Sequence, residues 1–285
     1  MVSLYQEVRA ALRESVFKPK KKLGQHFLIH EGTMGAILRL LDLSPGDEVL
    51  EIGPGLGFLT RRLVEAAGKV WAVEVDPFLI QWLRKSPLGS HPGLALIQGD
   101  ILKVPLGDIL SGHRVKLVAN LPYNISTPVL FRLFDLRDHF SLLVLMVQRE
   151  VAERMAASPG TKSYGTLSIW CQVHGQVLDK VSVSPEAFFP RPKVRSTVLK
   201  ITLHPEPLLA AERLPALRAL VRAAFGQRRK TLGNVLTGWL KKGREEVEAL
   251  LRREGIDPGR RGETLSIEEF IRLAHVLEAR QKAES

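Results

Sequence analysis

The most specific chemical motif in the sequence is Asn120-Leu-Pro-Tyr123, which closes a predicted strand over 115–119. The amine of an aromatic base such as adenine is a poor nucleophile, because its lone pair is delocalised into the ring. Acceptors placed around its N–H groups stabilise the charge that develops on the nitrogen during attack, and the Asn120 amide oxygen and the Leu121 carbonyl are suitable acceptors. Pro122 stiffens the turn, and Tyr123 offers a ring on which a base can stack. The alternative is an Asn–Pro turn with a buried tyrosine.

A glycine-rich loop, Glu51-Ile-Gly-Pro-Gly-Leu-Gly57, lies between a predicted strand and a predicted helix. Glycines let a ligand approach the backbone closely, and the helix N-terminus offers free N–H donors. The G-x-G-x-G spacing differs from the dinucleotide fingerprint G-x-G-x-x-G, which argues against a pyrophosphate site. A glycine-rich turn without a ligand is the alternative.

Carboxylates follow the second and third predicted strands. Glu74 can accept both hydroxyls of a ribose, because ligands of parallel sheets bind at the carboxyl ends of the strands. Asp76 precedes Pro77, which is typical of a helix N-cap. Asp100 can accept the amine of an adenine, while the Ile101 N–H can donate to a ring nitrogen. Each acid alone is equally well explained as a cap or a surface residue. The glycine-rich loop, Glu74 and Asp100, however, come after three successive strands, which favours a shared binding edge.

These motifs lie in a chain in which short apolar runs alternate with helical periods. Such alternation predicts an α/β fold with a parallel sheet covered by helices on both faces. The predicted strands are 48–52, 70–75, 94–98, 115–119 and 141–147, and the predicted helices are 3–14, 32–42, 57–67, 77–85, 128–134 and 164–173.

The pattern changes in the last third of the chain. Two strand-like runs, 177–183 and 194–203, are joined by a Pro-rich loop and predict an antiparallel addition at the edge of the sheet. Beyond them only helical periods remain. We therefore expect a first domain over 1–205 and a helical domain over 206–285, with helices near 208–225, 230–240, 244–254 and 266–280.

Composition narrows the class of protein further. The 285 residues carry 41 Lys and Arg against 30 Asp and Glu, a formal charge of +11, which suggests a polyanionic partner such as nucleic acid. The longest apolar run, 142–147, is too short to cross a bilayer, and residues 1–15 lack an apolar signal-peptide core. One cysteine and histidines without ligand spacing argue against a disulfide framework and a zinc site. We expect a cytoplasmic, monomeric protein with no metal and no membrane partner.

Three motifs occur together and in order: the glycine-rich loop, Asn120-Leu-Pro-Tyr-Asn-Ile-Ser-Thr127 and Phe189-Pro-Arg-Pro-Lys-Val-Arg-Ser196. Together they resemble the S-adenosylmethionine-dependent rRNA adenine N6-dimethyltransferases. The tail Arg222-Ala-Ala-Phe-Gly-Gln-Arg-Arg-Lys-Thr-Leu-Gly-Asn234 resembles the KsgA (RsmA) branch, which modifies small-subunit rRNA. The resemblance covers residues 18–275. It implies a Rossmann-like class I methyltransferase sheet, with helices on both faces, and a small all-α C-terminal domain.

The same resemblance implies S-adenosylmethionine as the cofactor and 16S rRNA in the 30S subunit, or its precursor, as the substrate. Two adjacent adenosines in a hairpin loop near the 3′ end would each be dimethylated at N6. The implied cofactor residues are Gln25, His26, Leu28, Glu51, Gly53, Gly55, Glu74, Asp100, Ile101 and Asn120. Many relatives have Asn where this chain has His26. The implied target-base residues are Asn120, Leu121, Pro122, Tyr123 and Phe189, although on residue type alone Phe188-Phe189 is more typical of packing at a sheet edge.

Short basic clusters are by default solvated surface, but beside a base pocket they become candidate phosphate contacts. These candidates are Lys20, Lys21, Lys22, Arg191, Arg195, Arg222, Arg228, Arg229 and Lys230. Two alternatives stay open. One is an Erm-type methyltransferase acting on 23S rRNA, a branch that typically lacks the 222–234 tail. The other is a ribosome-assembly factor that keeps the fold without the chemistry, against which the intact set of acceptors argues.

Overall fold

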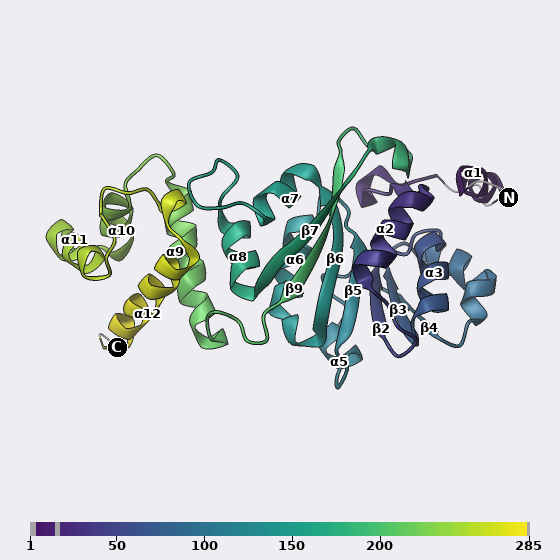
Figure 1. The fold of residues 1–285 in the computed structure, drawn as a ribbon, viewed down its shortest axis with the longest axis horizontal. Coiled ribbons are helices and arrows are strands. Elements are labelled where there is room, and N and C mark those ends of the chain that lie inside the picture. Colours follow the sequence, from purple (N-terminus) through teal and green to yellow (C-terminus); the bar gives the residue numbers. More distant parts are fainter. Residues whose placement is uncertain (1–3, 15–17, 284–285) are drawn as a thin grey trace. The chain divides into compact units, whose positions relative to one another are not determined.

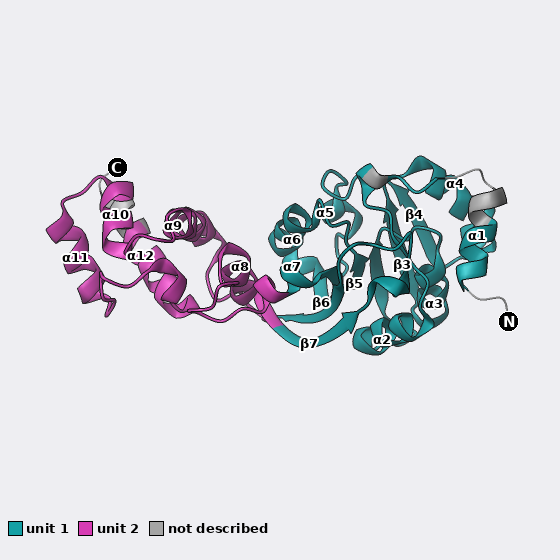
Figure 2. Ribbon diagram, turned by 90° about the horizontal axis from the view of Figure 1, so that it is seen from above, with its two compact units in different colours: residues 1–152, 177–203 teal, residues 153–176, 204–285 magenta. Residues whose placement is uncertain are grey.

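The computed structural model describes residues 4–14 and 18–283. The chain divides into two compact units, coloured separately in Figure 2: residues 1–152 with 177–203, and residues 153–176 with 204–285. The chain passes for the last time from the first unit to the second between residues 203 and 204, close to the boundary expected at 205. Residues 153–176, expected in the first domain, group with the C-terminal helices. The two-domain division at 205 therefore stays a prediction about folding units.

The first unit is built on a seven-stranded sheet with the order β4-β3-β2-β5-β6-β9-β7 (Figure 1). Neighbouring strands from β4 to β6 are parallel, and β9 runs antiparallel to β6 as expected. The bounds are β2 Glu48–Ile52, β3 Lys69–Glu74, β4 Leu94–Gln98, β5 Val115–Asn120, β6 Phe140–Gln148, β7 Gly175–Val183 and β9 Ser196–Leu203. The sheet confirms the predicted α/β class.

Helices cover both faces of this sheet, with α2 and α3 on one face and α5 and α6 on the other (Figure 2). This coverage explains why the central strands read as nearly continuous apolar runs, since both of their faces are buried. Val144 on β6 and Val118 on β5, for example, are at most 1% exposed. The bounds are α1 Leu4–Glu14, α2 Glu31–Leu41, α3 Phe58–Ala66, α4 Pro77–Lys85, α5 Leu106–Ile109, α6 Ser126–Asp135 and α7 Arg149–Met155.

The strand order reverses at β2, which pairs with β3 on one side and β5 on the other. Connections leave such a point in opposite directions, and a crevice opens beyond the carboxyl ends of the strands. All the candidate motifs that follow β2, β3, β4 and β5 therefore meet at this edge.

A second, two-stranded sheet joins distant parts of the first unit. Strand β1, Phe27–Leu28, pairs antiparallel with β8, Phe188–Phe189. The register sets Phe27 opposite Phe189 and Leu28 opposite Phe188. This ladder links the segment before α2 to the loop before β9, and the sequence pattern does not reveal it because each strand has only two residues.

The second unit is helical. Its helices are α8 Thr166–His174, α9 Leu214–Gly226, α10 Leu232–Leu240, α11 Arg244–Arg253 and α12 Ile267–Ala283. The ring of Phe225 on α9 lies 5.9 Å from that of Phe270 on α12 and 5.9 Å from that of Tyr164. The buried Tyr164 hydroxyl donates to the Leu265 carbonyl at 2.9 Å, so this aromatic cluster satisfies its one polar group.

Candidate active site

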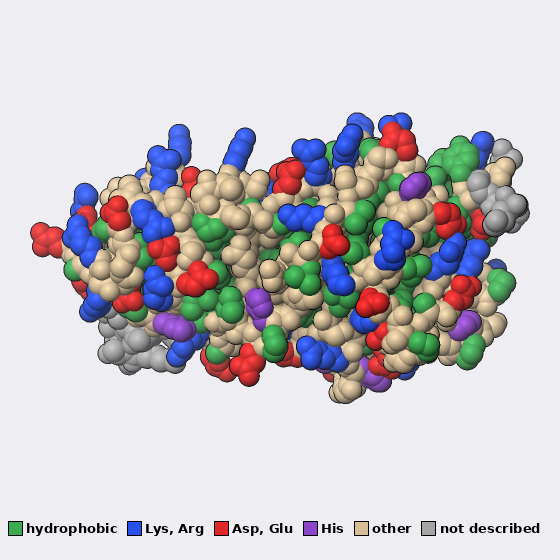
Figure 3. All heavy atoms as spheres, viewed as in Figure 1, with side chains coloured by type: hydrophobic (Ala, Val, Ile, Leu, Met, Phe, Trp, Pro, Cys, Tyr) green, Lys and Arg blue, Asp and Glu red, His purple; other side chains and the backbone are tan. Residues whose placement is uncertain are grey.

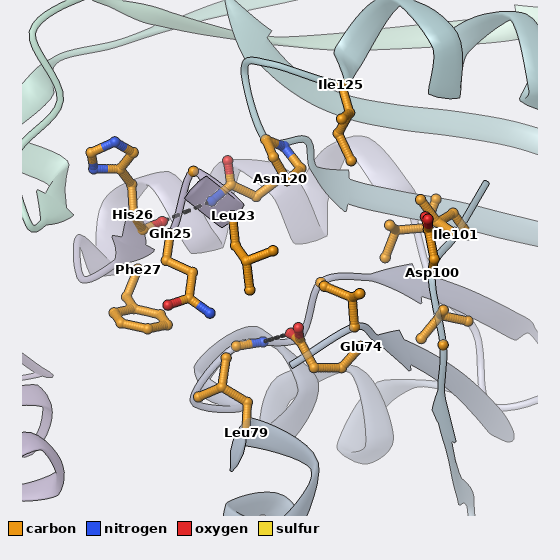
Figure 4. A pocket seen from close by; sticks show the side chains of 18 residues that line it. Leu23, Gln25, His26, Phe27, Glu74, Leu79, Asp100, Ile101, Asn120 and Ile125 are labelled. Carbon is orange, nitrogen blue, oxygen red and sulfur yellow. Dashed lines mark hydrogen bonds between the residues drawn. The ribbon is translucent and has the colours of Figure 1, made fainter. Parts of the chain in front are cut away.

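A pocket lies at the carboxyl ends of the parallel strands in the first unit (Figure 4). An adjoining pocket shares part of its wall and adds Leu28 and Glu51. The predicted cofactor residues therefore come together, although they belong to separate segments of the chain. The first pocket is lined by Leu23, Gly24, Gln25, His26, Phe27, Ile52, Gly53, Gly55, Val73, Glu74, Val75, Leu79, Gly99, Asp100, Ile101, Asn120, Pro122 and Ile125.

The glycine-rich loop forms the wall of the pocket between β2 and α3. Gly53 and Gly55 have φ of 73° and 60°, a region that side-chain-bearing residues avoid. A Cβ on Gly53 would point into open space, whereas a Cβ on Gly55 would lie only 3.0 Å from the Phe27 ring. The bare backbone of Gly53 therefore leaves room for a ligand, whereas that of Gly55 makes room for the Phe27 ring.

The Glu74 carboxylate lies at the end of β3 with each oxygen already anchored. Oε1 accepts from the Asp76 N–H at 2.9 Å, and Oε2 accepts from the Gly55 N–H at 3.2 Å. Burial raises the pKa of Glu74, and these backbone bonds oppose the rise. Each oxygen keeps a lone pair for a further donor, which is the geometry needed to accept two hydroxyls of one ribose.

The Asn120 side chain at the end of β5 is oriented by a single hydrogen bond. Its Nδ2 donates to the His26 carbonyl at 3.1 Å, which leaves Oδ1 as an acceptor (Figure 4). The following Leu121 N–H donates to the Met146 carbonyl at 3.0 Å, so β6 holds the turn in place. The segment around His26 thus determines which atom of Asn120 is presented to the pocket.

Tyr123 is half-buried beside this turn, and its hydroxyl forms a hydrogen bond of 2.7 Å with the Ser196 hydroxyl. Burial raises its pKa, so the phenol stays neutral near pH 7. The His26 ring stacks on Tyr123 at a centroid distance of 5.7 Å, and its Nδ1 lies 2.6 Å from the Pro190 carbonyl. The imidazole is therefore turned toward the Tyr123 side of the site and away from Glu74.

Phe189, the predicted second stacking face, is half-buried and lies outside the lining of both pockets. Its ring meets Tyr5 of α1 edge-on at 5.7 Å. Phe188 is buried in the core of the unit. This arrangement matches the packing alternative for the pair, and the stacking role of Phe189 stays a prediction.

An ion pair and a hydrogen bond that the sequence did not predict hold the N-terminal segment beside the pocket. Asp76 caps α4 as predicted, accepting from the Phe78 N–H at 3.0 Å, but its buried carboxylate also pairs with Lys20 at 2.7 Å and accepts from Gln25 at 2.8 Å. These partners hold the pKa of Asp76 below its usual value against the opposing effect of burial. Lys20, expected to contact phosphate, is thus engaged with Asp76, because a buried carboxylate needs a counter-charge.

Glu51, in β2 at the start of the glycine-rich loop, is buried, with 3% of its surface exposed. Burial raises its pKa to about 7. Within the described residues its Oε2 has no hydrogen-bond partner. A buried carboxyl that lines a pocket and has one oxygen without a partner is suited to a polar or cationic group of a bound ligand.

The predicted RNA contacts differ in how free they are. Lys and Arg side chains project from the surface with acidic groups among them (Figure 3). Arg191 pairs with Glu186, and Arg228 pairs with Glu263 at 3.1 Å while donating to the Tyr164 carbonyl at 2.9 Å. The side chain of Lys21 lies outside the described part of the structure. The remaining candidates are exposed: Lys22, Arg195, Arg222, Arg229 and Lys230.

Residues 4–14 and 18–283 contain no group of three or more His, Cys, Asp or Glu side chains arranged to hold a metal ion. None of their helices combines the length and apolarity required for a bilayer span.

Comparison with known sequences shows the family to which the chain is similar. Residues 16–279 match the sequence profile of the family Ribosomal RNA adenine dimethylase. A Geobacter metallireducens protein named Ribosomal RNA small subunit methyltransferase A is 44% identical over 272 residues, covering 94% of this chain and 98% of the relative. A protein of the same name from Geobacter sulfurreducens is 46% identical over 266 residues, covering 92% and 96%.

Solved structures give the same result. A dimethyladenosine transferase from Plasmodium falciparum superposes with a TM-score of 0.77 at 28% identity, covering 90% of this chain and 98% of that one. The 23S rRNA methyltransferase ErmE gives a TM-score of 0.66 at 27% identity, covering 88% and 99%. With its motifs at the strand ends and its similarity to these proteins over nearly its whole length, the chain belongs to the ribosomal RNA adenine dimethylase family.

Proposed function

We propose that this protein transfers methyl groups from S-adenosylmethionine to N6 of two adjacent adenosines in a hairpin loop near the 3′ end of 16S rRNA, dimethylating each one. It acts as a monomer on the 30S subunit or its precursor and takes part in the biogenesis of that subunit. The observation that carries the proposal is the meeting of Glu74, Asp100 and Asn120 at one pocket edge. In the proposal, one of these acceptors holds the ribose of the donor, one holds its adenine, and one holds the reacting amine of the substrate.

The pocket residues fit the proposed methyl donor. The open space over Gly53 and the anchored carboxylate of Glu74 suit a nucleoside that lies against the loop. In this proposal Glu74 holds the ribose, and Asp100 and Ile101 hold the adenine. Gly53, Gly55 and Glu51, whose Oε2 has no partner among the described residues, surround the methionine moiety. Gln25, His26 and Leu28 close the pocket from the N-terminal segment. The bound donor supplies an electrophilic methyl group on a sulfonium, which needs no metal and no covalent enzyme nucleophile.

The protein's own contribution is alignment and charge stabilisation. Asn120 Oδ1 and the Leu121 carbonyl accept from the adenine N6–H groups and stabilise positive charge on that nitrogen. The neutral Tyr123 ring supports one face of the flipped base, and Phe189 is the proposed support for the other. Attack on the methyl group gives N6 a positive charge, and this cationic nitrogen is far more acidic than the neutral amine. Its proton therefore passes to solvent without a dedicated base.

Two observations favour small-subunit rRNA over the alternatives. The relatives that cover nearly the whole chain carry small-subunit methyltransferase names, and the 222–234 tail is present. Exposed Arg222, Arg229 and Lys230 belong to that tail and are the proposed phosphate contacts of the helical unit, with Lys22 and Arg195 in the first unit. The intact acceptor set argues against a factor that binds without chemistry.

The test is methyl transfer from radiolabelled S-adenosylmethionine to unmodified 30S and 50S particles, followed by nucleoside analysis. The proposal predicts N6,N6-dimethyladenosine in 16S rRNA alone. Label in 23S rRNA would favour the Erm-type activity. Binding to 30S without any label would favour the non-catalytic assembly factor.

A further inference from the structure

The turn that follows β4 is closed around Asp100. The Lys103 and Val104 N–H groups donate to the Asp100 carbonyl at 2.7 and 2.9 Å, and the Leu102 N–H donates to Asp100 Oδ1 at 2.9 Å. A Cβ on Gly99 would lie 2.4 Å from the Val104 side chain, so the turn packs closely on itself. One carboxylate oxygen is therefore engaged inside the turn, which leaves Oδ2 for a ligand.

Arg132 reaches this turn from α6, a different element of the first unit. Its Nη1 donates to the Leu102 carbonyl at 2.6 Å, and its Nη2 donates to the Val104 carbonyl. The two carbonyls are two residues apart on the same turn, so one guanidinium spans it. Its Nε is buried and has no hydrogen-bond partner in the described part of the chain. All the donors that Arg132 uses therefore go to the backbone that follows Asp100.

We infer that Arg132 is a positioning residue for the adenine of the methyl donor, acting through the 100–104 turn. The inference rests on the proposed function. A planar guanidinium offers two parallel donors at fixed spacing, and a lysine ammonium in its place would hold one carbonyl well and the other poorly. By fixing the turn, Arg132 holds the Asp100 carboxylate and the Ile101 N–H in the register that reads the adenine edge, although it does not itself line the pocket.

The competing explanation is that Arg132 merely fastens α6 to the sheet. The two roles differ in their consequence for ligand choice. A structural fastener would lower stability and weaken all ligands alike. A positioning residue would instead reduce the preference for adenine over a base with a carbonyl in place of the amine and a protonated neighbouring ring nitrogen. The amine contact depends on Asp100 and the ring-nitrogen contact on the Ile101 N–H, and both belong to this turn.

The experiment compares two probes by calorimetry with the full-length protein, S-adenosylhomocysteine and S-inosylhomocysteine, which has a carbonyl in place of the adenine amine. Wild-type protein should prefer the adenine form. Arg132→Gln should reduce that preference about tenfold, the usual contribution of one charge-assisted hydrogen bond, here the one between the adenine amine and Asp100. Arg132→Lys should retain part of the preference for the adenine form. Because the preference is a ratio within one protein, it does not depend on the fraction of folded molecules.

Arg114→Gln is the matched control, since Arg114 also donates to a backbone carbonyl of the first unit, that of Phe140 at 3.3 Å, and does not line the pocket. It should leave the preference unchanged. An unchanged preference in Arg132→Gln would overturn the inference while leaving the proposed function intact. If Arg132→Gln does not fold, an unchanged preference in Arg132→Lys would overturn the inference instead. Wild-type protein that binds neither probe would overturn the proposed function and the inference with it.

Discussion

Replacing Asn120 with alanine removes two things that the structure separates. The Nδ2 bond to the His26 carbonyl, at 3.1 Å, is an ordinary neutral hydrogen bond and contributes about 1 kcal/mol to the order of the N-terminal segment. The Oδ1 acceptor acts where charge develops, and losing such a group typically lowers kcat by about 10²–10³. We therefore expect kcat to fall about 100- to 1000-fold while the Kd for S-adenosylhomocysteine rises no more than about fivefold.

The assay is single-turnover methyl transfer to 30S particles, with donor affinity measured separately by calorimetry. Asn124→Ala is the matched control, because Asn124 makes the same kind of bond to the same segment, donating to the Lys22 carbonyl at 3.2 Å, yet does not line the pocket. Its kcat should stay within about threefold of wild type, since only a neutral, exposed hydrogen bond is lost. If both variants lose the same activity, or if Asn120→Ala keeps full activity, the acceptor role is refuted.

Three other predictions concern backbone strain, pH and RNA affinity. Gly24 has φ of 61°, and a Cβ there would lie 3.2 Å from the Pro122 side chain, so Gly24→Ala should lower the free energy of unfolding by about 1–2 kcal/mol in urea titrations; an unchanged midpoint would contradict this. Burial raises the pKa of Glu51 from 4.5 to about 7, so the folded state binds its proton more tightly, and the stability that Glu51 contributes is lost as pH rises through 7. Glu51→Gln should therefore gain up to about 3 kcal/mol relative to wild type between pH 4.5 and 8, and a difference that does not change with pH would argue against the buried acid. Arg229→Ala should reduce the slope of log binding constant against log salt concentration for RNA binding by about 0.7. Arg228→Ala breaks the pair with Glu263 and should mainly lower stability. Equal slopes for Arg229→Ala and wild type would show that Arg229 does not contact phosphate.

Sequence patterns located most of the sheet because its signals are local. Strand 94–98 and helix 77–85 have the bounds expected, the latter marked by Asp76 before Pro77. Helix α7, Arg149–Met155, was not expected, since seven residues directly after a strand are too few to show a helical period. The β1–β8 ladder was missed for a related reason: its register joins Phe27 to Phe189, and no local pattern encodes so distant a pairing.

In the site, too, residues marked by a local pattern could be predicted, whereas contacts between distant residues could not. The meeting of Glu74, Asp100 and Asn120 at one pocket could be predicted, because each lies at the end of a strand or just after it and parallel strands bring their carboxyl ends to one edge. The engagement of Lys20 by Asp76 was not identified, because the two residues are 56 positions apart and charge alone does not specify a partner. Arg228 is a similar case, since its sequence neighbours suggest RNA whereas its contacts are to Glu263 and the backbone.

A crystal structure with bound S-adenosylhomocysteine would show the proposed donor site itself. We expect ribose hydroxyls on the Glu74 carboxylate, the adenine amine on Asp100 Oδ2, and the sulfur directed toward Asn120 Oδ1. A ligand bound elsewhere, or bound in this pocket with its sulfur facing away from Asn120, would contradict it.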